Sequence, residues 1–306
     1  MEIQHFIKGI VFSLTAFIGL CGNTLILMSL SSIAYQEKKI MPAEIILVNL
    51  AVSHLVLLIT LGLPHSLYEF GVKYFKTDLD CKFDAYFLRV SRIMSIGLTC
   101  LLSCFQCVTL ISSHPTWGLL KAWLQKNIIS ILLGICMLSM VSSISSALYP
   151  VINTNLTDQR PAFNLGYFYV VYPNRFVYQL IGFIMFSRDL VFMTLMALAS
   201  MYILLVLHRH SKQMKGMRST DQTNTAERQA AKMVVTFVVL YVLFFGIDTS
   251  LWFYQTSISN EGPPAINDIR HFLTFCFPSA FPMILITFNQ KVRCKLTCFA
   301  LKHSDI

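Results

Sequence analysis

The chain has 306 residues, 55% of them hydrophobic and 13% charged, which leaves too few charges to cover the surface of an ordinary soluble protein. Its net charge of +9 would suit a nucleic-acid partner, but most Lys and Arg residues lie between apolar stretches that are too long for soluble helices. This pattern is typical of a membrane protein, so we expect a lipid bilayer as the partner and no nucleic acid. The nine cysteines do not predict a disulfide framework, because six of them lie inside the apolar runs.

Seven apolar stretches reach the roughly 20 residues that a helix needs to cross a bilayer. We predict spanning helices at residues 9–32, 45–68, 82–112, 127–149, 176–207, 229–256 and 271–289. The tail, residues 290–306, has the apolar and basic spacing of a short amphipathic helix on the membrane surface. There is no internal repeat, so the prediction is an all-α membrane protein in which residues 1–306 form a single seven-helix domain.

The loop charges predict the orientation of this bundle. With the N-terminus outside and the C-terminus inside, about twice as many Lys and Arg residues lie on the cytoplasmic side as on the outside, where Arg270 is one of the few. The single Asn-x-Ser/Thr sequence begins at Asn155 and then lies in the longest outside loop, where it can carry a glycan. The two independent signals predict the same topology.

The third predicted helix carries two arginines near its outer end, Arg89 and Arg92. Their face continues at spacings of three or four with Ser95, Thr99, Ser103 and Gln106. An arginine that faces lipid costs on the order of several kcal/mol, so this face must point into the bundle, where the arginines meet an acid or line a wet cavity. Hydrogen bonds between helices are the ordinary explanation for the smaller polar residues.

The sixth predicted helix carries one acid, Asp248, on a face with Trp252 and two further aromatic residues. Aromatic side chains beside an acid indicate the wall of a ligand pocket. A structural ion pair between Asp248 and Arg89, Arg92 or Arg188 explains the same pattern equally well.

Two adjacent charges, Arg188 and Asp189, interrupt the fifth predicted helix and are candidates for ion pairs inside the membrane. Neighbouring residues on a helix point about 100° apart and cannot both face one partner. We therefore expect at least one of the two to pair with another helix.

No pattern of catalytic or metal-binding residues stands out. His54 and His65 are better explained as buried histidines of the bundle than as metal ligands, because no second histidine, cysteine or carboxylate stands at ligand spacing. Phosphate loops, nucleophile elbows and zinc-protease motifs are absent, so we expect no enzyme, no cofactor and no metal. In the tail, Cys294 and Cys298 are candidates for palmitoylation, although two unmodified thiols explain the pattern equally well.

Four segments carry a family resemblance: LRVSRIMSIGLTCLLSCFQCVTL at 88–110, LHRHSKQ at 207–213, ERQAAKMVV at 227–235 and CFPSAFPMIL at 276–285. Together they resemble the vomeronasal type 1 receptors, including their fish olfactory relatives. The resemblance covers nearly the whole chain. It implies a G-protein-coupled chemosensory receptor of the plasma membrane, which responds to small pheromone-like or odorant molecules and couples to an inhibitory-class G protein.

The chain departs from mainstream G-protein-coupled receptors at several motifs. The rhodopsin-like DRY triplet falls on Phe105, Gln106 and Cys107, and the acidic position of the second helix falls on His54. The seventh helix keeps Pro282 but has neither the Asn before it nor the Tyr after it. These losses fit the vomeronasal type and the similar type 2 bitter taste receptors.

One departure concerns the vomeronasal family itself. Phe168 stands where its members usually have a cysteine, so Cys81 has no extracellular partner in the sequence and we expect no disulfide there. This leaves open an accessory receptor that acts through a partner receptor, and a receptor dimer.

The leading hypothesis is a receptor that binds a small organic molecule in the outer half of the bundle. An anionic ligand is favoured, because arginines outnumber acids among the intramembrane charges. A transporter or channel would use the same charges as a permeation path, but the broken helix pairs typical of transporters are missing. The expected ligand contacts are Arg89, Arg92, Asp248, Trp252 and His271.

Overall fold

The computed structural model describes residues 3–38, 40–72, 77–111, 115–152, 162–164, 168–214, 222–258 and 264–304. Its helices are α1 (Ile3–Glu37), α2 (Pro42–Leu57), the π-helix η1 (Leu58–Gly62), α3 (Leu63–Glu69), α4 (Asp78–Ile111), α5 (Pro115–Ser142), α6 (Ile144–Leu148), α7 (Arg175–Met214), α8 (Gln222–Ile258), α9 (Pro264–Phe288) and α10 (Gln290–Ser304). Three short strands, β1 (Pro150–Val151), β2 (Ala162–Asn164) and β3 (Tyr169–Val171), form an antiparallel sheet in the order β1-β3-β2.

Seven segments are long and apolar enough to cross a membrane, which confirms the predicted number. The second combines α2, η1 and α3, and the fourth combines α5 and α6. Most helices are longer than the apolar ranges predicted from the sequence, because those ranges end where polar residues begin. A helix can continue past that point until another group binds the free backbone amides or carbonyls at its end. Asn174 illustrates this at the start of α7, where its side-chain oxygen accepts a hydrogen bond from the Val177 amide at 2.8 Å.

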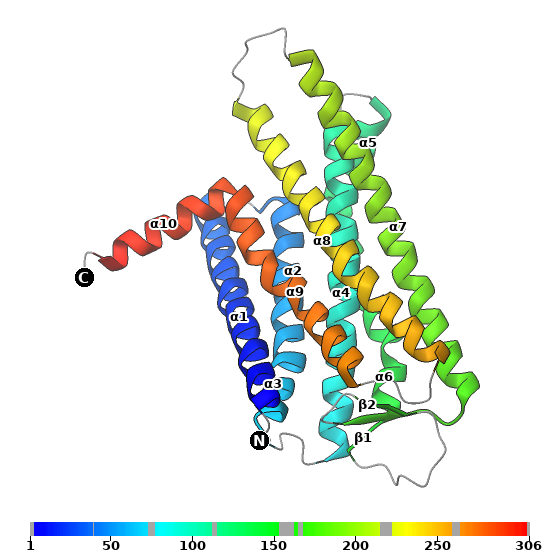
Figure 1. The fold of residues 1–306 in the computed structure, drawn as a ribbon. Coiled ribbons are helices and arrows are strands. Elements are labelled where there is room, and N and C mark those ends of the chain that lie inside the picture. The colour runs from blue at the N-terminus through cyan, green and yellow to red at the C-terminus, as the bar shows by residue number, and fades with distance from the viewer. Residues whose placement is uncertain are drawn as a thin grey trace.

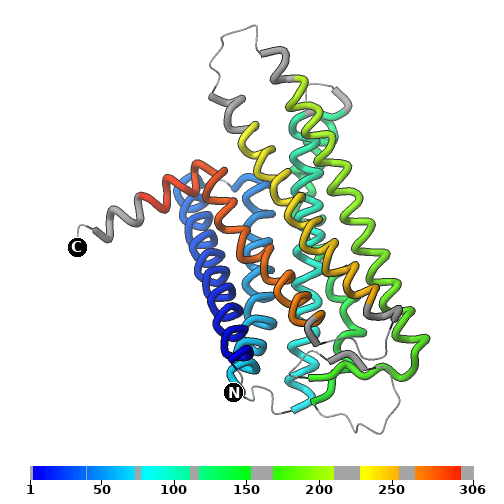
Figure 2. The backbone as a smooth tube through the Cα atoms, in the orientation of Figure 1, coloured from blue at the N-terminus to red at the C-terminus, as the bar shows by residue number. Residues whose placement is uncertain are grey.

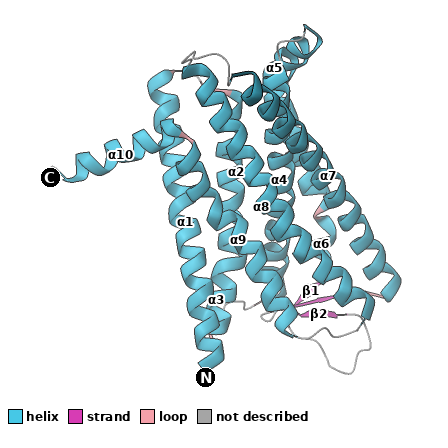
Figure 3. Ribbon diagram, turned by 45° about the horizontal axis from the view of Figure 1, so that its top comes forward, coloured by secondary structure: helices cyan, strands magenta, loops and turns pink. Residues whose placement is uncertain are grey.

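The helices form one bundle with α4 in the middle, packed against α2, α5, α7 and α8 (Figure 1). α1 packs against α2 and α9, and α9 packs against α8. The N-terminus and the small sheet lie at the same end of the bundle, which we call the sheet end (Figures 1 and 3). α10 leaves the bundle near the other end and extends away from it (Figure 2).

The polar face predicted on α4 is buried in the bundle. Ser95, Thr99 and Ser103 are almost completely shielded from solvent. Ser95 forms a hydrogen bond to His54 of α2 at 3.1 Å, whereas the hydroxyls of Thr99 and Ser103 donate to the carbonyl four residues earlier in their own helix. Of these three residues, only Ser95 thus links two helices through its side chain. The hydroxyls of the other two form their hydrogen bonds within α4.

Proline inside α9 explains a polar contact with α1. Pro282 has no amide hydrogen, so the carbonyl of Pro278 loses its usual helical donor. The side-chain amide of Asn23 replaces that donor at 2.9 Å. Next to it, Gly22 lies so close to the Pro282 ring that an added Cβ would be 2.7 Å from it. A glycine and an asparagine therefore fit α1 to the proline-containing part of α9.

Beyond the end of α9, a lysine ties three helices together. The Lys291 ammonium group lies 2.8 Å from Glu37 at the end of α1 and 3.7 Å from Glu44 near the start of α2. The hydrogen bond to Glu37 is the main reason why the pKa of Lys291 is raised above its usual value. Val292 is fully buried against the bundle, so α10 is held by both its charge and its apolar face.

Candidate functional site

A cavity opens into the bundle toward the sheet end. It encloses about 1140 Å³, counting the part that is open to solvent, and it is lined by α4, α7, α8 and α9 and by residues of the β3 region. Its wall combines apolar and aromatic side chains with a few charged groups, which is the lining typical of sites that bind small organic ligands.

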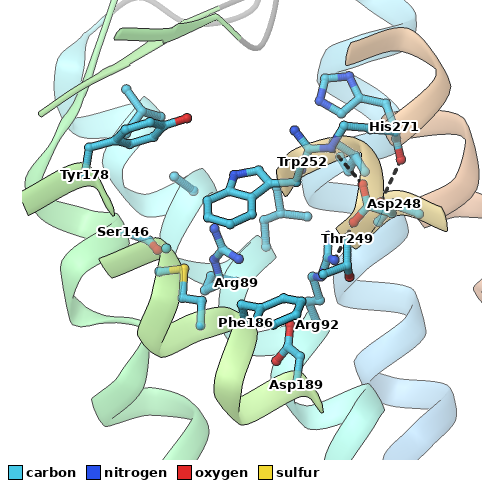
Figure 4. A pocket seen from close by; sticks show the side chains of 18 of the residues that line it. Arg89, Arg92, Ser146, Tyr178, Phe186, Asp189, Asp248, Thr249, Trp252 and His271 are labelled. Carbon is cyan, nitrogen blue, oxygen red and sulfur yellow. Dashed lines mark hydrogen bonds and ion pairs between the residues drawn. The ribbon is translucent and has the colours of Figure 1, made fainter. Parts of the chain in front are cut away.

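All five residues expected to contact a ligand line this one cavity (Figure 4). Arg89 and Arg92 come from α4, Asp248 and Trp252 from α8, and His271 from α9. The helical spacing that placed the arginines on the inward face of α4 therefore located the wall of a real cavity. Their role as ligand contacts stays a prediction.

Asp248 joins three helices through two arginines. Its carboxylate accepts a hydrogen bond from Arg92 at 2.5 Å and another from Arg270 of α9 at 3.0 Å, and its side chain is 2% exposed. Arg92 also lies over the ring of Phe245 at 4.7 Å. The ion-pair explanation of Asp248 thus holds for Arg92, and the residue also lines the cavity.

Arg270 is a member of the site that sequence reasoning missed. It was counted among the charges outside the membrane, because it precedes the apolar window of the seventh helix. In the structure α9 begins at Pro264, so Arg270 lies within the helix and lines the cavity. The adjacent His271, which was among the expected contacts, is the signal that could have pointed to it.

Arg188 and Asp189 form an ion pair with each other, so the expectation that one of them pairs with another helix is wrong. The guanidinium of Arg188 donates two hydrogen bonds to Asp189, at 2.7 and 2.9 Å. The Cα–Cβ bonds of neighbouring residues do point about 100° apart, but the arginine side chain is long enough to curve back and reach the carboxylate of the next residue. Asp189 lines the cavity and its charge is already balanced by Arg188.

Arg89 has no hydrogen bond or ion pair with any residue in the part of the chain that the structure describes. In the view of Figure 4 its guanidinium lies beside Trp252, in the middle of the lining residues. The described lining holds three arginines (Arg89, Arg92 and Arg270) and two aspartates (Asp189 and Asp248), and Arg188 engages one of the aspartates. The cavity wall therefore has an excess of positive charge.

Aromatic side chains shape the rest of the wall. The indole of Trp252 packs directly on Gly182 of α7, where an added Cβ would overlap the ring. The rings of Tyr172 and Tyr178 lie 5.0 Å apart, centre to centre. Burial raises the pKa of Tyr172, so its hydroxyl stays neutral at physiological pH and can donate a hydrogen bond into the cavity.

Phe168 fills the place next to Cys81. The Cys81 thiol is free and fully buried, and it packs with Phe168, which is 1% exposed and also lines the cavity. An aromatic contact thus holds the chain before β3 against the start of α4.

Two histidines behave differently from each other. His54 is buried between Ser95 and the rings of Phe277 and Phe281, as expected of a bundle histidine. For His65 the expectation that no ligand-type neighbour stands nearby is wrong, because Glu69 follows four residues later on the same helical face and lies 3.9 Å away.

The candidate modification sites fall mostly outside the described residues. Asn155 lies in a segment that the structure does not describe. Cys294 is exposed on α10, and the side chain of Cys298 is not among those described.

Comparison with known proteins identifies the family to which the chain belongs. Residues 6–297 match the model of the vomeronasal organ pheromone receptor family. The chain is 33% identical over 299 residues to olfactory receptor class A-like protein 1 of Danio rerio. This match covers 97% of this chain and 94% of that protein. It is 25% identical to vomeronasal type-1 receptor 3 of Homo sapiens, over 95% of this chain and 94% of the relative.

The match to the family extends over nearly the whole chain, and the seven spanning helices are those of a multi-pass plasma-membrane protein. The chain belongs to the vomeronasal organ pheromone receptor family and is a chemosensory receptor of the G-protein-coupled kind.

Proposed function

We propose that the receptor responds to a small anionic molecule, a carboxylate or a sulfate, bound in the cavity with its charge on Arg89. The observation that carries this proposal is the unpartnered guanidinium of Arg89, among the described residues, in a cavity wall that already has a positive excess. An arginine offers several donors in a fixed plane and stays charged at physiological pH, so it selects carboxylate and sulfate oxygens over an amine.

The rest of the ligand is expected to be apolar. Trp252, Phe186, Met185 and Leu88 line the same cavity, and they offer contact area but no charge. With Tyr172 as a neutral donor, the site suits a compact hydrophobic body with one acidic group. In the N-outside orientation that the loop charges predict, the cavity opens to the outside, where such a molecule would arrive.

Activation is proposed to run through Asp248. The carboxylate of Asp248 holds Arg92 on α4 and Arg270 on α9, and so it fixes α8 between them. Arg89 precedes Arg92 by three residues on the same face of α4, so we expect an anion on Arg89 to compete with Asp248 for Arg92. A ligand can shift the resting bundle only by its difference in affinity for the two states, so this competition supplies the coupling. An inhibitory-class G protein would bind at the other end of the bundle.

The proposal is tested by the ligand response of Arg89→Gln. Cells that express the receptor are exposed to matched series of carboxylates, sulfates, neutral amides and amines, and G-protein activation is recorded. The wild type should respond to the acids, and Arg89→Gln should weaken that response about tenfold or more, because a charge-assisted hydrogen bond is worth about 1.5–3 kcal/mol.

Arg175→Gln is the matched control, since Arg175 is an exposed arginine at the start of α7 and is not among the cavity-lining residues. It should respond as the wild type does, at equal surface expression. Activation by amines alone, or an undiminished response of Arg89→Gln to acids, would contradict the proposal. An ion flux that follows the ligand without a G protein would favour the channel alternative.

A further inference from the structure

A cluster of potential metal ligands lies at the sheet end, beside the cavity. His65 and Glu69 from α3 and Asp268 from α9 each offer one ligand atom, and these atoms all lie within 4.8 Å of one another. His5 of α1 adds its Nδ1 atom, 2.8 Å from Glu69. We propose that this cluster binds a divalent transition-metal ion, with Zn²⁺ as the ion that its nitrogen and oxygen ligands suit best.

The donor set favours zinc over magnesium or calcium. Zn²⁺ takes histidine nitrogens and carboxylate oxygens at about 2.0–2.1 Å in a tetrahedron, which places two ligands about 3.4 Å apart. From a spacing of 4.8 Å each ligand atom must move inward by only about 0.8 Å, a small side-chain rotation. Mg²⁺ and Ca²⁺ prefer six or more oxygens, and the described cluster has two carboxylates.

The burial of Glu69 gives an independent reason to expect a cation. Its side chain is 3% exposed within a membrane bundle, and its described ion-pair contacts are histidines rather than lysine or arginine. A buried carboxylate needs a positive partner, because an isolated charge is expensive away from water. A bound metal ion supplies such a charge directly at the carboxylate.

Lys8 is the competitor at this site. Its ammonium group lies 2.6 Å from Asp268, with about a third of its side chain exposed. A metal ion that takes Asp268 as a ligand displaces this ammonium toward solvent. Removing the Lys8 charge should therefore strengthen metal binding, whereas removing a ligand should weaken it.

The site also touches the cavity. The ring of His65 lies edge-on to the ring of His271, 4.8 Å between centres, and His271 lines the cavity. The Nδ1 atom of His271 has no hydrogen-bond partner among the described residues. A metal ion that draws His65 inward therefore changes the packing of a cavity wall, so zinc is expected to alter the ligand response as well.

Metal binding is tested without any odorant. The full-length receptor is purified in lipid nanodiscs through a histidine-free tag, stripped with a chelator, and titrated with ZnCl₂ or MgCl₂ while thermal unfolding and bound metal are measured. The wild type should bind one Zn²⁺ and gain about 3 °C or more in Tm at saturation, with no gain from Mg²⁺.

Four variants make the result specific. Glu69→Gln and Asp268→Asn should each weaken Zn²⁺ binding about tenfold or more, and Lys8→Met should strengthen it several-fold. His208→Ala, which removes an exposed histidine near the opposite end of α7, should leave it unchanged. Wild type without a zinc-dependent shift would overturn the site, as would zinc binding that survives both carboxylate variants or weakens in Lys8→Met. Because no ligand is used, these results do not depend on whether the receptor responds to acids.

Discussion

The side-chain amide of Asn23 in α1 donates a hydrogen bond to the carbonyl of Pro278 in α9 across a distance of 2.9 Å. The same amide also lies 2.7 Å from the carbonyl of Gly19 in its own helix. Pro282 deprives the Pro278 carbonyl of its helical donor, and Asn23 is completely buried, so no lipid or water can replace it.

Asn23→Leu should therefore destabilise the receptor by about 1–3 kcal/mol, the cost of a buried acceptor without a donor. The measurement is the Tm of the purified receptor. Thr24→Val is the control, because the Thr24 hydroxyl bonds only to a carbonyl within α1 and faces outward. Equal Tm values for both variants would contradict the role of Asn23.

Asp248→Asn should cost more, about 3–5 kcal/mol, because it leaves Arg92 and Arg270 buried without their counter-charge. Adding Arg270→Gln to Asp248→Asn should recover part of that loss, since the double variant removes one unbalanced cation. A double-mutant cycle on Tm and surface expression measures this coupling. Strictly additive effects would show that the two side chains do not stabilise each other.

Gly182→Ala should change the ligand response by displacing Trp252. The new methyl group would overlap the indole, which forces the ring to move toward the cavity. We expect at least about a tenfold loss in potency with near-normal surface expression, measured with any active ligand. Gly134→Ala is matched to it, because nothing lies within 4 Å of that position in α5, and it should keep the wild-type potency.

Phe168→Ala should destabilise the sheet end by about 3 kcal/mol or more, because Phe168 is buried against Cys81. Reducing agent, in contrast, should leave the Tm of the wild type unchanged, since the Cys81 thiol is free in the structure. Cys81→Ser should likewise cost little surface expression. A Tm that falls on reduction would show a disulfide at Cys81 and contradict this pair of expectations.

Residue spacing predicted the framework of the site well. The recurrence of polar residues every three or four positions placed Arg89 and Arg92 on the inward face of α4, and the same reasoning placed Asp248 and Trp252 on a pocket wall. Helical geometry fixes which face a residue occupies, so these inferences needed no knowledge of the neighbouring helices. In the structure these four residues and His271 line one cavity.

The pairing of the charged side chains was less predictable, because it depends on how far each side chain extends and on where each helix begins and ends. Arg270 lay beyond the apolar window, although the helix extends past it. The Arg188 side chain curves back to Asp189, and the direction in which its Cα–Cβ bond points does not show this. The Asp268 carboxylate meets His65 and Glu69 only because α9 begins where α3 ends, at the same level of the bundle, a relation that no spacing along the chain contains.

The π-helix η1 has a consequence for comparing this receptor with its relatives. A wider turn at Leu58–Gly62, just before Pro64, holds an extra residue and rotates everything after it by about 100° relative to an unbroken α-helix. This rotation is what turns His65 and Glu69 toward α1 and α9. A relative with a regular α-helix here would present the residue one position away to those neighbours, so a gapless alignment of the two chains would equate side chains that face different parts of the bundle.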